Sequence, residues 1–253
     1  MLEFKHWLCK FLTLKRKPLM IFRQLFDTES STYTYFIADD KSGEAVFIDP
    51  VHTHINDYLD LLKQHQCVLK YSLETHVHAD HITGGGLLRQ KTNALTAVAS
   101  ACGAATADLQ LKDGDEIKFS QEAIKVIATP GHTPGSISFL WRDRIFTGDA
   151  LLINGCGRTD FQGGSANAMF DSIVNKLFKL PDDTIVYPGH DYHHRRISCI
   201  AQEKTSNARL AGKSLEEFVQ IMNNLNLPKP RLIDIAVPAN RMCGIPEDAI
   251  TQG

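Results

Sequence analysis

Histidine and aspartate side chains, which bind metal ions through nitrogen or oxygen, gather at four separate places in this sequence. The densest is the run His76-Val77-His78-Ala79-Asp80-His81, and the other three are Gly131-His132, Gly148-Asp149 and Gly189-His190. A lone histidine or aspartate beside a strand is usually a capping or surface residue. A run this dense, followed by the same ligand residue types at three later places, predicts a metal site instead.

Each of these places follows an apolar run typical of a buried β-strand. The runs are VLKYSLE before Thr75-His76, AIKVIA before the segment that ends at His132, RIFTG before Asp149 and TIVYPG before His190. Because strands of one sheet end close together, ligands far apart in sequence can converge there, and rigid strand ends hold them at fixed distances. The sequence therefore predicts that the four places meet at one sheet edge.

The remaining pattern predicts alternating strands and helices. Strands are expected over 32–37, 44–48, 122–128, 136–141, 144–147 and 184–187, and helices over 56–65, 84–92, 166–179 and 215–225. There is no internal repeat, low-complexity block or evident linker. We predict one α/β domain over residues 20–253, with a helical and loop cap at its C-terminal end.

Composition is that of an ordinary globular protein, with 43% hydrophobic and 22% charged residues in a chain of 253. A formal net charge of −2 does not indicate a nucleic-acid surface, and no apolar run approaches the roughly 18 residues that cross a bilayer. The six cysteines are scattered without CxxC spacing, which favours free thiols in a reducing compartment. We expect neither nucleic acid nor membrane as a partner.

Residues 1–19 differ from the rest because they are rich in Lys and Arg and contain a single acid, Glu3. An organelle-targeting peptide is basic and amphipathic in this way, but usually richer in serine. We interpret the segment as a disordered basic extension that precedes the folded domain.

These motifs resemble a known family. The run Thr75-His76-Val77-His78-Ala79-Asp80-His81, with the later PGHT, TGD and PGH segments at His132, Asp149 and His190, is similar to the ligand signature of the metallo-β-lactamase superfamily. The resemblance implies an α/β fold, the αββα sandwich, in which two central mixed sheets are flanked by helices and the metal lies at the sheet edge.

Within that superfamily the chain resembles the persulfide dioxygenases, the group named for ethylmalonic encephalopathy. The similar segments are GCGRTDFQ at 155–162, YPGHDY at 187–192 and AVPAN at 236–240, followed by Cys243-Gly244. The resemblance implies oxidation of glutathione persulfide by O2 to sulfite and glutathione. It also implies a single Fe(II) bound by His76, His132 and Asp149. Two imidazoles and a carboxylate on one face of an octahedron leave positions where substrate and O2 can bind together.

The resemblance also implies substrate contacts. Glutathione carries two carboxylates, and Arg158 can hold a carboxylate through two parallel hydrogen bonds. Tyr192 and Arg209 match positions that contact glutathione in the family, and Cys243 matches a cysteine near the active site. His52 and His54, which follow Asp49-Pro50, are interpreted as loop residues rather than ligands.

The ligand inventory alone leaves a second metal open. In hydrolases of the superfamily, residues matching His78, Asp80, His81 and His190 complete a two-zinc site that generates hydroxide. In the dioxygenase interpretation the same residues orient the iron ligands through hydrogen bonds. The main alternative is thus a glyoxalase II-type thioesterase that hydrolyses acylglutathione with two zinc ions. A non-catalytic partner-binding module is the other alternative, although the intact ligand set argues against it.

Several properties follow from the resemblance only. Members of the family are often dimers, so a homodimer is expected. Whether a sulfurtransferase delivers the persulfide stays open. The expected compartment is the cytoplasm, or the mitochondrial matrix if the source is eukaryotic.

Overall fold

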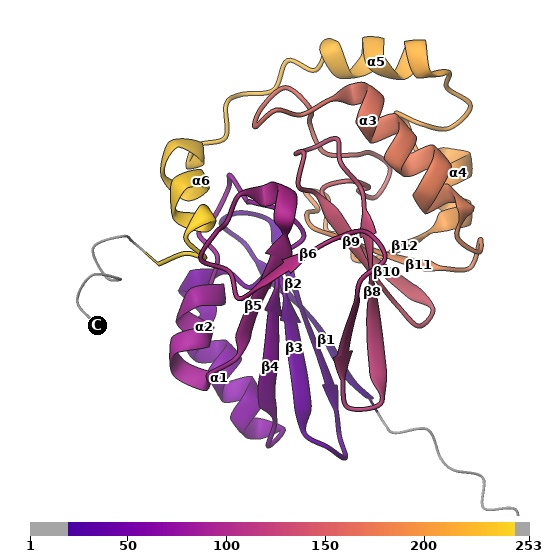
Figure 1. Cartoon of the computed structure of the whole chain (residues 1–253). Helices are drawn as coiled ribbons and strands as arrows, with labels where there is room; N and C mark the ends of the chain where they lie inside the picture. The colour runs from indigo at the N-terminus through magenta and orange to yellow at the C-terminus, as the bar shows by residue number, and fades with distance from the viewer. Residues whose placement is uncertain (1–19, 246–253) are drawn as a thin grey trace, which may run out of the picture.

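Two six-stranded sheets pack face to face in the computed structural model, which describes residues 20–245 (Figure 1). Their strand orders are β1-β2-β3-β4-β5-β6 and β12-β11-β10-β9-β8-β7. The predicted basic extension, residues 1–19, lies outside the described residues. In the part of the chain that is described, no helix combines the length and apolar character that crossing a bilayer requires.

The first sheet comes from the N-terminal half of the chain. Its antiparallel strands β1, β2 and β3 are followed by the parallel strands β4, β5 and β6. The bounds are β1 Met20–Asp27, β2 Thr32–Asp39, β3 Glu44–Ile48, β4 Val68–Leu73, β5 Leu95–Ala99, β6 Leu109–Leu111, η1 His52–His54, α1 Ile55–Gln64, α2 Gly85–Thr92 and η2 Ser100–Cys102.

The second sheet is antiparallel except for the parallel pair β10 and β11, which the helix-rich segment 166–179 connects. The bounds are β7 Glu116–Phe119, β8 Glu122–Ala128, β9 Ile137–Trp141, β10 Arg144–Gly148, β11 Ile185–Pro188, β12 Ser198–Cys199, α3 Ala166–Asp171, η3 Ser172–Lys176, η4 Leu177–Lys179, α4 Ile200–Ser206, α5 Leu215–Asn223 and α6 Ile233–Arg241.

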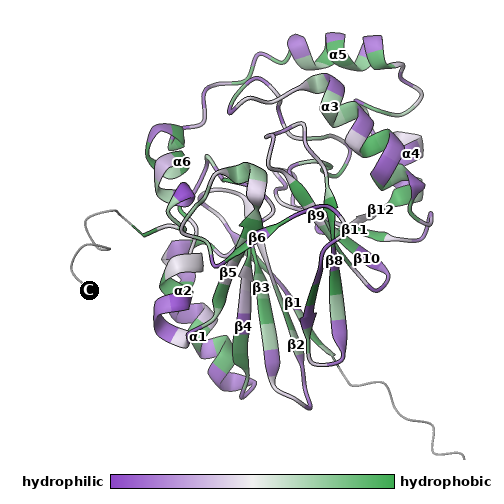
Figure 2. Ribbon diagram, in the orientation of Figure 1, coloured by the Kyte–Doolittle hydropathy of each residue, from purple (hydrophilic) through white to green (hydrophobic). Residues whose placement is uncertain are grey.

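Three apolar layers hold these elements together. The largest lies between the sheets and includes the fully buried Tyr35, Trp141 and Phe146. A second packs α1 and α2 against the first sheet, and a third packs α3, α4 and α5 against the second sheet. Hydrophobic residues accordingly concentrate in the strands, and the outer helices are mixed (Figure 2). The arrangement is the predicted αββα sandwich with two mixed sheets.

The predicted elements agree with the structure, but several others were not predicted. Strands β1, β5, β6, β7 and β12 and helices α4 and α6 did not stand out in the sequence. The predicted helix over 166–179 is a short α-helix that continues as a π-helical and then a 3₁₀ turn. Helix α6 contains Pro238 in its interior, where proline removes a backbone donor.

Candidate metal centre

His76, His132 and Asp149 come together at the edge between the two sheets. A donor atom from each side chain lies within 4.8 Å of the other two. His76 follows β4, His132 follows β8 and Asp149 directly follows β10, so three strand ends place the three side chains. Gly148 has a φ of +49°, and a Cβ there would lie 2.5 Å from the Thr75 hydroxyl oxygen. Only glycine permits this approach of the two strand ends.

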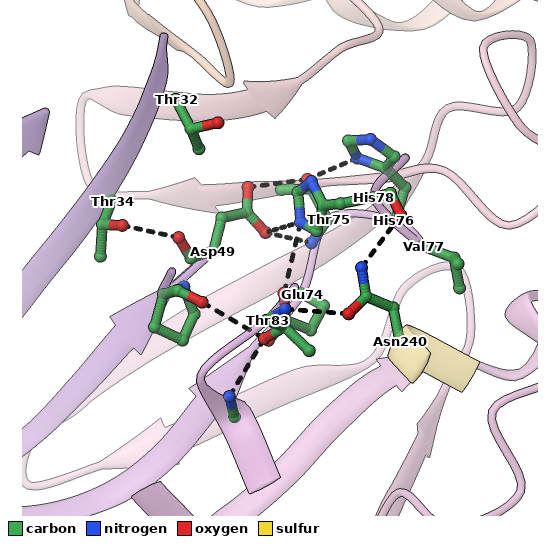
Figure 3. Close-up of polar contacts among 12 residues, drawn as sticks. Thr32, Thr34, Asp49, Glu74, Thr75, His76, Val77, His78, Thr83 and Asn240 are labelled. Atoms are coloured by element: carbon green, nitrogen blue, oxygen red, sulfur yellow. Dashed lines mark hydrogen bonds and ion pairs between the residues drawn. The ribbon is translucent and has the colours of Figure 1, made fainter. Parts of the chain in front are cut away.

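A short hydrogen-bond chain orients the His76 ring. Thr75 Oγ1 donates to Asp49 Oδ2 over 2.8 Å, so its oxygen is left to accept from His76 Nδ1 at 3.0 Å (Figure 3). This fixes the tautomer with the proton on Nδ1. Nε2 of His76 is buried and has no hydrogen-bond partner among the described residues. A buried lone pair without a donor is costly unless a metal ion accepts it.

The other two side chains are oriented in the same manner. His132 Nδ1 lies 2.7 Å from the backbone oxygen of Arg158, which leaves Nε2 as the free nitrogen. Asp149 uses its two oxygens differently: Oδ1 lies 2.6 Å from His190 Nδ1, and Oδ2 lies 3.6 Å from His132 Nε2. One carboxylate oxygen and two imidazole nitrogens therefore face a common point.

Electrostatics leave these groups in the protonation states that bind metals. Burial, and then the neighbouring His78 and His132, lower the pKa of His76 well below its usual value, so the ring is neutral at pH 7. Burial alone would raise the pKa of Asp149, but the facing His190 outweighs it and holds that pKa below the usual range. A neutral imidazole and an ionised carboxylate are what a divalent cation needs, so the residues fit a metal ion.

His78, Asp80, His81 and His190 form an adjoining network. His190 spans two carboxylates, because Nδ1 contacts Asp149 and Nε2 lies 3.0 Å from Asp80 Oδ2. Although burial opposes a charge, these carboxylates raise the pKa of His190 well above its usual value. A donor atom from each of His78, Asp80 and His81 also lies within 4.8 Å of the other two. Within the described chain, His78 Nδ1 and His81 Nε2 lack hydrogen-bond partners.

Asn240 of α6 holds the loop that carries these histidines. Its amide nitrogen donates to the backbone oxygen of His78 over 2.9 Å, and its Oδ1 accepts from the Thr83 backbone N–H over 2.8 Å (Figure 3). The same amide nitrogen also donates to the backbone oxygen of His81 over 2.8 Å. Thr83 also donates its hydroxyl to Glu74 over 2.5 Å. The C-terminal helix thus fixes the conformation of the histidine-rich loop.

A cavity of about 620 Å³ opens beside two of the three metal-facing side chains, His132 and Asp149. His132, Asp149, Asp80 and His190 contribute to its floor, and the segments 152–158, 190–195 and 227–231 contribute to its walls. Cations are prominent in the walls: Arg158, Arg195, Arg209, Lys229 and Arg231. The cavity suits a small anionic molecule that reaches the metal-facing groups.

Arg158 lines the cavity, but its expected two-bond clamp is already occupied. Nε and Nη2 bind the two oxygens of Asp160 over 2.6 and 2.7 Å, and the remaining bonds reach the backbone oxygens of Leu227 and Pro228. These four bonds leave one of the five guanidinium N–H groups free. In this conformation the forked face of Arg158 is engaged by Asp160, and the expected contact from Arg158 to the substrate stays a prediction.

The other three predicted substrate contacts differ in position. Tyr192 is 65% exposed at the cavity wall, with its ring stacked on that of His190. Arg209 lines the cavity and donates to the Cys156 backbone oxygen over 2.5 Å. Cys243 does not line it: its thiol is buried against the hydroxyls of Thr96 and Thr106. Burial raises the pKa of the Cys243 thiol, which favours an inert packing role.

Comparison with known proteins agrees with this geometry. Residues 27–190 match the model of the metallo-beta-lactamase superfamily. The chain is 50% identical to the human mitochondrial persulfide dioxygenase ETHE1 over 230 residues, 90% of each chain. It is 55% identical to ETHE1 from Myxococcus xanthus, whose crystal structure superposes with a TM-score of 0.87 over 89% of this chain and 100% of that one. The chain belongs to the persulfide dioxygenase family.

The thioesterase relatives are more distant than the persulfide dioxygenases. A hydroxyacylglutathione hydrolase from Brucella anthropi is 32% identical over 216 residues, 83% of this chain and 81% of that one. Identity therefore favours the dioxygenase family, as the GCGRTDFQ and YPGHDY segments indicated.

Asp49, Thr75 and Asn240 had no assigned role in the sequence. Asp49 could have been found, since it follows strand β3 as Asp149 follows β10. The role of Asn240 depends on a contact 162 residues away, which carries no local signal.

Proposed function

We propose that the protein is a persulfide dioxygenase, which oxidises glutathione persulfide with O2 to sulfite and glutathione. The observation that carries the proposal is the trio His76, His132 and Asp149, whose donor atoms face one point beside a cation-lined cavity. This is the two-histidine, one-carboxylate set that non-haem Fe(II) oxygenases use. About 50% identity to named persulfide dioxygenases over most of the chain supports the same activity.

The proposed cofactor is one Fe(II) per chain, bound by His76 Nε2, His132 Nε2 and Asp149 Oδ2. When bound, ferrous iron supplies the one-electron chemistry that allows O2 to react with a thiolate sulfur. The chain orients the ligands through Thr75, the Arg158 carbonyl and His190. Such outer contacts are typically worth 10- to 100-fold in metal affinity (an order-of-magnitude figure).

The proposed substrate site is the cavity wall. Arg209, Tyr192 and the free N–H of Arg158 offer hydrogen bonds to the two glutathione carboxylates, and Arg231 and Lys229 add positive charge at the rim. Held there by its peptide, the persulfide directs its outer sulfur towards the metal-facing side chains. Cys243 is left out of this proposed contact set because its thiol faces Thr96 and Thr106.

The alternative is a two-zinc thioesterase. It is favoured by one observation, the unpartnered nitrogens His78 Nδ1 and His81 Nε2. Against it stands sequence identity, which is 32% to a hydroxyacylglutathione hydrolase but 50% to a persulfide dioxygenase. A homodimer, a sulfurtransferase partner and a cytoplasmic or mitochondrial matrix location remain proposals from family resemblance.

Oxygen consumption distinguishes the two activities. The purified protein with Fe(II) is mixed with glutathione persulfide in an oxygen electrode, and sulfite is measured at the end. We expect O2 uptake and sulfite in equal amounts, with no hydrolysis of S-lactoylglutathione. Thioester hydrolysis without O2 uptake would reject the dioxygenase and support the two-zinc alternative.

A further inference from the structure

A continuous hydrogen-bonded chain leads from the cavity floor to the protein surface. At its inner end, Thr32 Oγ1 lies 3.0 Å from both Asp80 Oδ2 and His190 Nε2, which line the cavity. Thr32 Oγ1 is 2.8 Å from the hydroxyl of Ser30, and that hydroxyl lies 2.5 Å from Asp27 Oδ2. Each contact is of hydrogen-bond length, so the chain has no gap over this part.

The outer half continues through an acid and a histidine. Asp27 Oδ1 lies 3.0 Å from His54 Nε2, and His54 Nδ1 lies 2.9 Å from Asp57 Oδ2. Side-chain exposure rises along this path, from 9% for Asp27 through 35% for His54 to 74% for Asp57. The chain therefore ends in solvent. His54 is not among the residues that line the cavity, so this exit is separate from the cavity mouth.

The fold builds this chain from segments that are separate in sequence. Asp27 ends β1, Ser30 is in the β1–β2 turn and Thr32 begins β2, while His54 precedes the first residue of α1. Ser31 has a φ of +61° in that turn, and Thr32 forms a β-bridge with His190. Tyr33 N–H donates to the Gly189 carbonyl over 2.8 Å, which fixes Thr32 beside His190.

The proposed reaction releases a proton that must leave the cavity. The persulfide anion, O2 and one water give the glutathione thiol, sulfite and one proton. The S–S bond breaks, and the outer sulfur gains three S–O bonds and supplies all the electrons that O2 takes up. One hydrogen of the water remains on the thiol, and the other leaves as the proton. Glutathione in the cavity would block the direct route through the mouth.

We propose that Thr32, Ser30, Asp27 and His54 carry this proton from the cavity to solvent. The inner hydroxyls pass the proton by exchanging hydrogen bonds and need not ionise. His54 is the group that takes up and releases it. The inference rests on the proposed function, since the proton arises from that reaction.

The surroundings of His54 suit this role. The charged and titratable groups that face it are Asp27 from β1, and Asp57 and Tyr58 from α1. Burial lowers the pKa of His54, but its hydrogen bonds to the Asp57 and Asp27 carboxylates outweigh burial and raise that pKa above its usual value. Histidine is the side chain whose pKa lies closest to neutral pH, so it suits the transfer of protons to water.

The test is steady-state kinetics of the iron-loaded protein in dilute buffer, with His54→Gln and Asp27→Asn. We expect kcat to fall roughly tenfold, less than a lost general base costs because solvent retains some access. KM and iron content should stay unchanged. Added imidazole should restore kcat of the His54→Gln variant, since it replaces the outer carrier. Ser30→Ala should also lower kcat, because it removes the hydroxyl that links Thr32 to Asp27.

The matched control is His65→Gln, at the other end of α1, outside the chain of hydrogen bonds. It should keep wild-type kcat. As an independent readout, NMR titration should show the His54 pKa falling towards its usual value in Asp27→Asn. An unchanged kcat for His54→Gln in dilute buffer, with wild type consuming O2, would overturn the proton path alone. Wild type that consumes no O2 would overturn the proposed function and the path with it.

Discussion

The side-chain nitrogen of Asn240 lies 2.9 Å from the backbone oxygen of His78, across 162 residues of sequence. Helix α6 therefore completes the loop that carries His76. Although α6 contains Pro238 and lies outside both sheets, it supports a centre built from strand ends. The side-chain amide of Asn240 satisfies three buried backbone groups of that loop.

Replacing Asn240 by Ala should destabilise the protein by about 2–3 kcal/mol, because buried backbone groups of Thr83, His78 and His81 lose their partner. Thermal unfolding measures the loss, and iron content should fall with it. Asn224→Ala is the control, since its amide contacts a backbone oxygen in an exposed position of α5. Equal melting temperatures for the two variants would contradict the role of Asn240.

Thr75→Val should weaken iron binding roughly 10- to 100-fold. The substitution keeps the shape of the side chain but removes the hydroxyl that links His76 to Asp49. Iron affinity is measured by competition with a chelator. Thr129→Val is a suitable comparison, since Thr129 is a buried strand-end threonine whose hydroxyl contacts Ser138 instead. If both variants bind iron as wild type does, Thr75 does not orient the ligand.

Arg158→Ala should raise KM for glutathione persulfide about tenfold, the cost of a lost charged hydrogen bond, and change kcat little. Its guanidinium binds the backbone oxygens of Leu227 and Pro228 at the cavity wall, and it has one free N–H for the substrate. Arg158→Lys should not restore KM, because an ammonium cannot make the forked contact to Asp160. A lysine variant with wild-type KM would show that charge alone matters.

The ion pair of Glu122 and Arg142 should make stability depend on acid pH. Hydrogen bonds from Arg142 and Trp141 lower the pKa of Glu122, so folding favours the ionised carboxylate. The contribution is complete above the unfolded value of about 4.3 and is lost as pH falls through the lower folded value. The melting-temperature difference between wild type and Glu122→Gln should therefore be largest at neutral pH and should shrink as the pH falls below about 4.3. If this melting-temperature difference grew as the pH was lowered, the ionised form of Glu122 would not be the one that stabilises the fold.

Much of the fold could be predicted because the core strands carry their pattern locally. The runs of β2, β3 and β8 are rich in β-branched and aromatic residues, and turn residues bound them. Strand β1 did not stand out, since it is a half-buried edge strand that includes Arg23 and Gln24. Helix α6 was hidden by Pro238, and tertiary packing rather than local propensity forms it.

The residues at the centre were predictable for a similar reason, since each follows a strand that the pattern indicates. Their orientation was not. The tautomer of His76 depends on Thr75 and Asp49, and the state of Arg158 depends on carbonyls about 70 residues later in sequence. Such contacts arise from the three-dimensional arrangement and leave no periodic signal.

Elemental analysis of protein purified without added metal tests the central claim most directly, with Asp149→Ala and Asp80→Ala analysed beside wild type. The account predicts about one iron per chain in wild type, almost none in Asp149→Ala and most of it retained in Asp80→Ala. Two zinc ions per chain in wild type, with metal lost equally from both variants, would contradict a mononuclear iron centre.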